Sequence, residues 1–359
     1  MYSPVRHAGS IFHKGRPIHL TFFITRRCNS GCPFCFYLKN AGAKPVETGE
    51  LTLEEIGKIS GSFGRLLWLA FSGGEIFLRD DLAEISRTFY KNNRPSIMLF
   101  PTNGLLPELI RDTLEQVLKD CRKSVIAVKL SLDGLQDAHD SLRNTPGSFE
   151  KTMRTYHLLE EFPGRYPNFE LGVNTVFCSE NQDSMDEIID FVAGLENIRT
   201  HTISLVRGDL SDERFKKVDF TKYQHAISRL EDNLKNRTSG VYRFRGAKIK
   251  AAQDILQRRL IHRTMQEQRR LIPCFAGRLN LVMTENGDIY PCEILTTPMG
   301  SIRSHDYDIS KLLQSDRAKA VVHGIMNKQC FCTHECYFMT NILFNPVLFP
   351  GLLREYLQL

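Results

Sequence analysis

The sequence predicts an α/β protein with a parallel sheet, because apolar runs alternate with helical stretches six times over residues 18–208. Several of these runs are almost continuously apolar, which is typical of strands that helices cover on both faces. Repeated strand–helix units form parallel sheets through right-handed crossovers. Six units are too few for a closed eight-fold barrel, which would need two more.

The expected elements follow one another in a regular order. Strands are predicted at 18–25, 66–72, 96–102, 125–133, 169–177 and 200–206. Helices are predicted from Thr52 onward and over 82–90, 106–119, 149–161 and 184–195. Thr52 and Glu55 have the spacing of a capping box ahead of Ile56 and Ile59, which marks the start of the first helix. Ligands of such sheets bind at the carboxyl ends of the strands, so motifs there are candidates for function.

The composition is that of an ordinary globular protein. The 359 residues, 42% hydrophobic and 25% charged, suffice for one large α/β domain and a smaller one. A net charge of +6 is weak evidence for an anionic partner, and we expect no nucleic acid. The first residues lack the apolar core of a signal peptide, and no apolar run is long enough to span a bilayer. We therefore expect a cytoplasmic protein.

The ten cysteines are the most informative residues, and eight of them fall into two sets. Clustered short spacings in a long chain favour metal binding over disulfides. The first set is Cys28, Cys32 and Cys35, with the spacing C-x3-C-x2-C directly after the first strand. Thiolates suit iron–sulfur clusters, and three of them leave one iron of a [4Fe-4S] cluster open for another ligand. A zinc site with a fourth ligand from elsewhere is the alternative.

At these residues the sequence resembles the radical S-adenosylmethionine (SAM) enzymes. In that family the amino and carboxylate groups of SAM chelate the open iron. Phe34 matches the family's aromatic position before the third cysteine. The resemblance implies that residues 18–208 form an open partial (β/α)6 barrel of the TIM type, preceded by an N-terminal extension at 1–17.

Further motifs at strand ends match the SAM contacts of this family. Gly73, Gly74 and Glu75 follow the second strand, where the glycines allow close approach and positive φ, and the carboxylate suits an ammonium group. A plain turn is the alternative there. For Thr102-Asn103-Gly104 after the third strand, a plain turn is expected and a direct contact with the ligand is the alternative. Val206-Arg207, at the end of the sixth strand, matches the place where relatives pass the adenine.

The fourth and fifth strands carry the remaining candidates. Ser131 and Asp133 have groups that bond to a ribose or an amino-acid head group, and Arg143 suits the SAM carboxylate because its donors are planar and paired. Asn174 matches a polar position near the ribose. A surface ion pair for Arg143, and a backbone partner for a buried Asn174, are the alternatives.

The second cysteine set lies near the C-terminus and comprises Cys274, Cys292, Cys330, Cys332 and Cys336. Asn286-Gly287 predicts a hairpin that brings Cys274 and Cys292 together. This segment, 273–345, resembles the SPASM and shorter twitch auxiliary-cluster domains of radical SAM enzymes, with Gly287-x4-Cys292 as the strongest match. A full SPASM domain has seven cysteines and two clusters.

Five cysteines imply a small α+β domain with one auxiliary [4Fe-4S] cluster held by four of them. Cys274, Cys292 and Cys336 are the preferred ligands, with Cys330 or Cys332 as the fourth. A four-cysteine zinc site is the alternative. His334 is expected to support or pack against this site rather than to ligate.

The remaining segments predict structural roles. Residues 209–272 read as a basic helical connector with a solvated face, or as a surface for an acidic or phosphorylated substrate. Cys121 and Cys178 are expected to be buried and inert. The apolar tail, 346–359, is interrupted by prolines and is expected to pack on the protein, with membrane-surface or partner contact as the alternative.

The resemblance implies a reaction in which SAM is cleaved reductively to a 5′-deoxyadenosyl radical that removes a hydrogen atom from the substrate. No catalytic side chain is assigned beyond the cluster and SAM, and a flavodoxin or ferredoxin is the expected electron donor. The substrate is expected in peptide maturation or in carbohydrate or secondary metabolism, as a peptide or a carbohydrate or nucleotide-linked molecule. A lipid-linked substrate, or a non-enzymatic iron–sulfur or zinc redox sensor, is the alternative.

Overall fold

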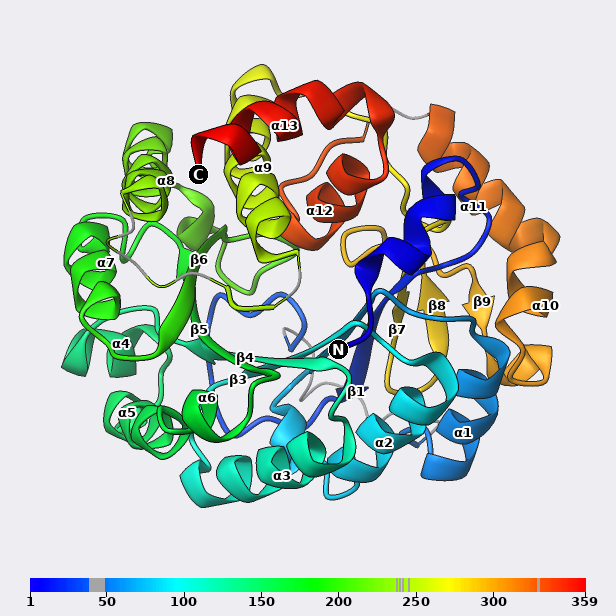
Figure 1. The fold of residues 1–359 in the computed structure, drawn as a ribbon, viewed down its shortest axis with the longest axis horizontal. Helices are drawn as coiled ribbons and strands as arrows, with labels where there is room; N and C mark the ends of the chain where they lie inside the picture. Colours follow the sequence, from blue (N-terminus) through cyan, green and yellow to red (C-terminus); the bar gives the residue numbers. More distant parts are fainter. Residues whose placement is uncertain (39–48, 237, 239, 241, 245, 328–329) are drawn as a thin grey trace.

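The computed structural model describes residues 1–38, 49–236, 238, 240, 242–244, 246–327 and 330–359. Its centre is one nine-stranded sheet with the order β6-β5-β4-β3-β2-β1-β7-β8-β9. Strands β6 to β1 curve around a central space, and helices cover their outer side (Figure 1). The sheet does not close on itself, because β6 lies at one edge and β9 at the other.

The six predicted strands are present and parallel. They are β1 His19–Thr25, β2 Trp68–Gly73, β3 Ile97–Thr102, β4 Val125–Ser131, β5 Phe169–Phe177 and β6 Ile198–Leu205. Side chains alternate along them: Ile126 and Val128 of β4 are buried in the outer core, whereas Lys129 lines a cavity inside the barrel. The prediction of an open partial barrel is confirmed.

The outer helices form where amphipathic stretches were predicted. They are α1 Leu53–Ser62, α2 Leu82–Asn93, α3 Pro107–Asp120, α5 Ser148–Leu159 and α7 Met185–Ala193, with the short α4 Gln136–Leu142 and α6 Phe162–Arg165 between them. The capping box is confirmed, since Thr52 Oγ1 accepts from Glu55 N at 3.2 Å and Thr52 N donates to Glu55 Oε2 at 2.8 Å. Single 3-10 turns complete the set: η1 Pro4–Ile11, η2 Ile76–Leu78, η3 Glu213–Lys216, η4 Arg303–His305 and η5 Pro346–Leu348.

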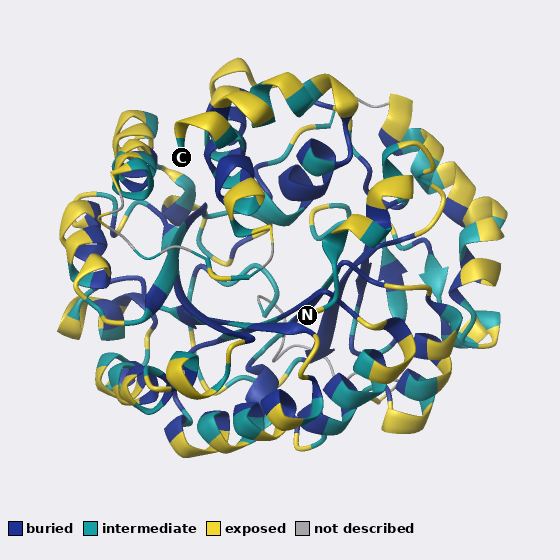
Figure 2. Ribbon diagram, viewed as in Figure 1, coloured by how far each residue is buried: buried dark blue, intermediate teal, exposed yellow. Residues whose placement is uncertain are grey.

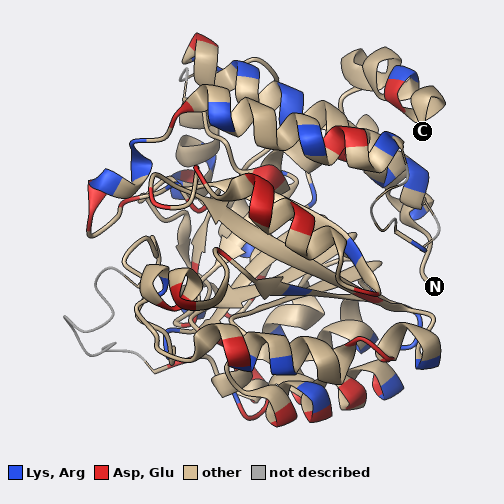
Figure 3. Ribbon diagram, turned by 90° about the vertical axis from the view of Figure 1, so that its left-hand side faces the viewer, with Lys and Arg blue, Asp and Glu red and all other residues tan. Residues whose placement is uncertain are grey.

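Two helices form the connector, α8 Phe220–Lys235 and α9 Ala247–Glu267. Together with the C-terminal helices, α9 fills the open side of the barrel beside β6 (Figure 1). Arg259 of α9 pairs with Glu231 of α8 and with Glu355 at 2.6 Å. Residues of both signs are spread over the ribbon of the helices turned to the viewer in Figure 3.

The C-terminal segment extends the barrel sheet. Strands β7 Asn280–Met283 and β8 Asp288–Tyr290 form the predicted antiparallel hairpin, followed by β9 Gly300–Ser301, α10 Ile309–Gln314 and α11 Asp316–Asn327. Gly287 in the hairpin turn has φ +90°, which only glycine adopts freely. Since β7 pairs in parallel with β1, this segment continues the barrel sheet rather than forming a sheet of its own.

The apolar tail packs on the protein as expected. Helix α12 Glu335–Leu343 is buried, and α13 Phe349–Gln358 lies outside it with its outer face exposed (Figure 2). Phe338 and Ile342 of α12, which precedes the tail, join the main hydrophobic core, and Leu348 and Leu352 of the tail pack against it. Pro350 stands in the first turn of α13, where its missing N–H costs no helical bond.

No single helix within the described ranges is apolar enough over a sufficient length to cross a membrane. Only α12 and residues Pro346–Gln358 taken together reach that length, and they meet at an angle of 89°.

Cys121 and Cys178 are fully buried. Burial raises the pKa of Cys121 to about 12 and that of Cys178 to about 11. Both are therefore protonated, unreactive thiols at neutral pH, as predicted.

The packing of the two C-terminal helices can be tested with two substitutions. Ile342 of α12 is fully buried, so Ile342→Ala should lower the free energy of unfolding by about 2–5 kcal/mol. Leu353→Ala in α13, where the side chain is 57% exposed, should change it by less than about 0.5 kcal/mol. Denaturant titration measures both, and equal losses would contradict a buried α12 beneath a half-exposed α13.

Candidate active site

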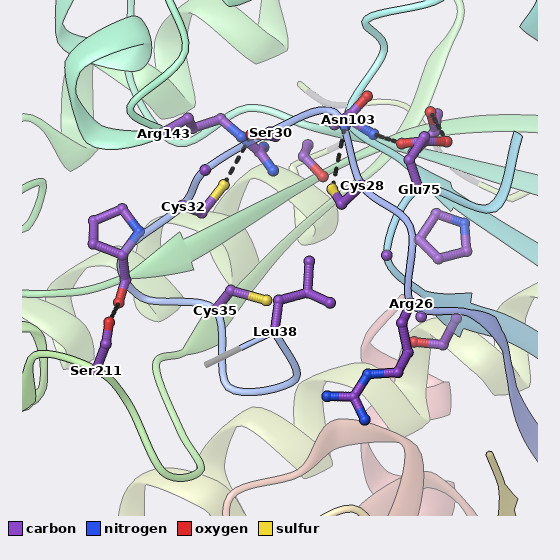
Figure 4. A pocket seen from close by; sticks show the side chains of 18 residues that line it. Arg26, Cys28, Ser30, Cys32, Cys35, Leu38, Glu75, Asn103, Arg143 and Ser211 are labelled. Carbon is purple, nitrogen blue, oxygen red and sulfur yellow. Dashed lines mark hydrogen bonds between the residues drawn. The ribbon is translucent and has the colours of Figure 1, made fainter. Parts of the chain in front are cut away.

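The three clustered cysteines line one cavity of about 610 Å³ at the carboxyl ends of β1 to β4. They stand on the loop that leaves β1 at Thr25, and Figure 4 shows Cys28, Cys32 and Cys35 around the same space. A turn between Cys35 N and Cys32 O, at 3.2 Å, tightens this loop. Burial raises the pKa of Cys28 and Cys35, so metal binding must displace their protons.

The Gly73-Gly74-Glu75 turn holds the start of the cysteine loop. Gly74 N donates to Thr25 O and Glu75 N donates to Arg27 O, both at 2.8 Å. Gly73 has φ +130°, and a Cβ on Gly74 would lie 2.0 Å from Arg27 O. The glycines therefore allow the cysteine loop of the same chain to approach closely. The expectation from the sequence was that they allow a ligand to approach.

Glu75 is a buried carboxylate at the wall of the same cavity. Burial raises its pKa to about 7, against the opposing effect of Asn103 N at 2.8 Å and Thr102 Oγ1 at 2.9 Å, which donate to it. A cation beside Glu75 would favour the ionised form. The side chain is thus suited to an ammonium group in the cavity.

Arg143 lines the cavity from the segment after β4. Its Nη1 lies 3.1 Å from Asp133 Oδ2, and Asp133 Oδ1 accepts from Val176 N at 2.7 Å. Burial alone would lower the pKa of Arg143, but Cys32 and Asp133 outweigh it and raise the pKa. The ion pair is buried rather than on the surface, and Asp133 lies behind Arg143, outside the lining of the cavity.

A second cavity, of about 340 Å³, lies inside the barrel and adjoins the first. The two share Ser72, Pro101 and Ser131 in their walls. Phe34 and Asn174 line this inner cavity and not the cysteine cavity. Of the predicted SAM contacts, the structure therefore brings Gly73, Gly74, Glu75, Ser131 and Arg143 together around the cysteines.

Some residues at the cysteines were not predicted. Ser30 Oγ lies 3.2 Å from Cys32 Sγ, and Asn103 Nδ2 lies 4.0 Å from Cys28 Sγ (Figure 4). Asn103 follows β3 in Thr102-Asn103-Gly104, for which a plain turn was expected. Its position at a strand end could have indicated a role in the site, whereas only its place between Cys28 and Cys32 could have indicated Ser30.

The cysteine loop is tied to the C-terminal hairpin. Tyr37 OH donates to Glu285 Oε2 in the β7–β8 turn, and Arg26 Nε lies 3.7 Å from Glu285 Oε1. Burial raises the pKa of Tyr37 far above its ordinary value, so its hydroxyl remains a donor. These contacts join residues about 250 positions apart in the chain.

The second cysteine set divides between two cavities. Cys274, Cys292, Cys330 and Cys332 line a small cavity with apolar walls, whereas Cys336 faces the inner barrel cavity. Arg270 Nη2 donates to Cys330 Sγ at 2.7 Å. Burial raises the pKa of Cys292 to about 11 and that of Cys332 to about 12. Within the described part of the chain, no three His, Cys, Asp or Glu side chains converge closely enough to hold a single metal ion.

His334 supports this region instead of facing the four cysteines. Its Nδ1 accepts from Cys336 N at the start of α12, and its Nε2 lies 2.5 Å from Glu293 Oε2. Burial and Arg207 lower the pKa of His334, but the pair with Glu293 outweighs them and raises it to about 9. Arg207 completes a buried network through Glu335 at 3.2 Å.

Comparison with known proteins agrees with this geometry. Residues 22–192 match the model of the radical SAM superfamily. The match covers β1, the cysteine triad and the Gly73-Gly74-Glu75 turn.

Residues 22–192 belong to the radical SAM superfamily.

Similar proteins extend the comparison beyond that domain. The AdoMet-dependent heme synthase of Methanosarcina barkeri is 26% identical over 304 residues, which are 81% of each chain. The subtilosin biosynthesis protein AlbA of Bacillus subtilis is 26% identical over 337 residues, 87% of this chain and 65% of AlbA. The structure of anSMEcpe with AdoMet and the Cp18Cys peptide has a TM-score of 0.59 at 18% identity, covering 95% and 99% of the two chains.

The described residues fit the cofactors of this family, a [4Fe-4S] cluster and SAM. Three soft thiolate ligands face one cavity, and the Glu75 carboxylate and the Arg143 guanidinium line the same cavity. An ammonium and a carboxylate are the two groups that such a pair complements.

The role of the glycine turn can be tested by adding one methyl group. Gly74→Ala would place a Cβ against Arg27 O, and should destabilise the protein by about 1–3 kcal/mol and reduce iron loading. Gly57→Ala in α1 meets no atom within 4 Å and should be neutral or stabilising by up to about 1 kcal/mol. Thermal unfolding and iron content decide; an unaffected Gly74→Ala variant would contradict the packing described.

Proposed function

We propose that this radical SAM enzyme removes a hydrogen atom from a peptide substrate held in the inner barrel cavity. The observation that carries the proposal is the contact between the two cavities. The cysteine cavity and the inner cavity share Ser72, Pro101 and Ser131, so a group bound beside the triad borders the barrel interior. When bound, the cluster and SAM supply a 5′-deoxyadenosyl radical for hydrogen abstraction.

The chain's own residues then have distinct roles. Cys28, Cys32 and Cys35 hold the cluster, Glu75 accepts from the amino group of SAM, and Arg143 binds its carboxylate. Asp133 fixes the guanidinium of Arg143 through the buried pair at 3.1 Å. Because that pair lies out of water, its geometry is held more firmly than a surface pair would be.

Other residues shape the path between SAM and the substrate. Ser131 stands at the junction of the two cavities. Asn174 and Phe34 line the inner side, where Asn174 Oδ1 accepts from Ser204 Oγ at 3.2 Å. We assign them to the ribose and to the wall around the reacting carbon. A protein of the flavodoxin or ferredoxin class would deliver the electron.

We further propose that Cys274, Cys292, Cys330 and Cys332 hold an auxiliary [4Fe-4S] cluster. Their shared apolar cavity supports this set over one that includes Cys336. Arg270, which donates to Cys330 Sγ, would stabilise a thiolate ligand. Such a cluster would supply an acceptor for the electron that an oxidised substrate gives up.

A peptide is proposed as substrate because two similar proteins point to peptide chemistry. AlbA serves the biosynthesis of a bacteriocin, and anSMEcpe was solved with a peptide bound. In this chain, the inner cavity of about 340 Å³ has room for a side chain rather than for a folded domain.

Removing any cysteine of the triad should abolish SAM cleavage. In Cys28→Ala, Cys32→Ala or Cys35→Ala, formation of 5′-deoxyadenosine with dithionite should fall to background. Cys121→Ala, which alters a buried thiol outside both sets, serves as the control and should keep activity. Retained 5′-deoxyadenosine formation in any triad variant would refute the assignment.

The auxiliary site predicts a different pattern. Cys292→Ala should lower the iron content from about eight to about four per chain and leave substrate-free SAM cleavage intact. Cys336→Ala should keep about eight, because its thiol faces the barrel cavity. If Cys336→Ala loses iron and Cys330→Ala or Cys332→Ala does not, the ligand set must be changed.

A further inference from the structure

We infer that Lys129 anchors an acidic group of the substrate inside the barrel. The inference rests on the proposed function only in treating the inner cavity as the substrate site. Lys129 projects inward from β4, two residues before Ser131, which borders the cysteine cavity. Anchor and reaction centre would therefore lie along one wall of the same cavity.

Lys129 is a buried cation that lacks a carboxylate partner. Protein surrounds its ammonium group, yet the side chain keeps accessible surface because it faces the cavity. No carboxylate oxygen of the described ranges lies within 4.0 Å of it. Uncompensated charge in a protein interior is costly, so a residue kept in this state points to a ligand that completes it.

The surroundings of the ammonium group suit an anion. Its Nζ donates to Thr200 Oγ1, to Thr202 Oγ1 at 3.2 Å and to Thr200 O at 3.4 Å, all on β6, so its neighbours are neutral acceptors. Hydroxyls that accept from an ammonium keep their own protons free to donate to a second acceptor. Lys129 reaches them across Gly172, where a Cβ would lie 2.7 Å from Nζ.

The charged groups around Lys129 act in both directions. On α9, Asp254 favours the charged form of Lys129 but pairs with Lys250, and Lys250 and Arg258 disfavour it; Glu170 on β5 favours it. Glu170 on β5 accepts from Arg243 N at 2.8 Å, and its other oxygen has no hydrogen-bond partner. His201 on β6 is neutral, since burial lowers its pKa to about 3.

These contacts assign a carboxylate, carried by a peptide side chain or by a free organic acid, to the Lys129 end of the cavity. Burial lowers the pKa of Lys129 to about 7, and an acid alongside would restore the full charge. Thr202, which contacts Lys129, and Ser204, which contacts Asn174, lie two residues apart on β6, so the hydroxyls continue from this end of the cavity toward Asn174.

The test is binding of defined probes to the reconstituted protein, read by calorimetry at pH 6.5. The probes are adipate, N-acetylglutamate amide, and their neutral counterparts adipamide and N-acetylglutamine amide. The carboxylate probes should bind and the amides should not. Binding of adipate alone assigns a free acid, and binding of the capped glutamate assigns a peptide side chain.

Variants separate the anchor from general effects. Lys129→Met should weaken carboxylate binding by about 10- to 100-fold, and Thr202→Val should weaken it less. Lys129→Arg should retain part of it. Lys250→Arg changes a lysine of the same cavity while keeping its pair with Asp254, and should bind like the parent. The inference is overturned if no probe distinguishes carboxylate from amide, or if Lys129→Met binds unchanged.

Substrate-free formation of 5′-deoxyadenosine by the parent tests the proposed function separately. If the parent cleaves SAM but binds no carboxylate, the anchor alone fails. If it binds carboxylate through Lys129 but cleaves no SAM, the proposed function fails and the anion site stands.

Discussion

The parallel pairing of β1 on both of its edges is the constraint on which the rest of the structure depends. His19 is in register with Trp68 of β2 on one side and with Asn280 of β7 on the other. The barrel and the C-terminal hairpin thus share one strand, and the cysteine triad follows at the end of that strand. Phe23 of β1 packs in one cluster with Val282 of β7 and Tyr337 of α12, against which Cys274, Cys292 and Cys336 lie.

The site is built by placing charges where water is excluded. Glu75, the Arg143–Asp133 pair, the Arg207 network and Lys129 all lie in the barrel or at its rim. Each costs desolvation energy that hydrophobic residues of similar size would not incur. Their concentration around two adjoining cavities marks this end of the sheet as the candidate functional one.

Much of this could be predicted from the sequence, and the misses have physical reasons. The strands could be predicted because they are almost continuously apolar, and the triad could be predicted because Cys28, Cys32 and Cys35 follow one another at short spacings directly after the first strand. The sequence did not predict that Phe34 and Asn174 line a different cavity from Glu75 and Arg143. Two adjoining cavities at the same strand ends cannot be told apart from the sequence. The Tyr37–Glu285 contact joins loops that only the β1–β7 pairing brings together.

Lys129 was not predicted as a functional residue. It lies within the predicted strand 125–133, where five of the first seven residues are apolar. The alternation of a strand sends it to the inner face, but only the curvature of the sheet makes that face a cavity wall. The place of Cys336 has a similar cause, because its position at the start of α12 puts it at the wall of the inner cavity, which its spacing in the sequence does not show.

The central claim is that the triad holds a cluster with one iron open to SAM. The most direct measurement is the electron paramagnetic resonance spectrum of the reduced, reconstituted protein before and after addition of SAM. The account predicts that SAM changes the spectrum in the parent and in Cys292→Ala, because the triad cluster takes it as a ligand. A spectrum that SAM leaves unchanged in both proteins would contradict it.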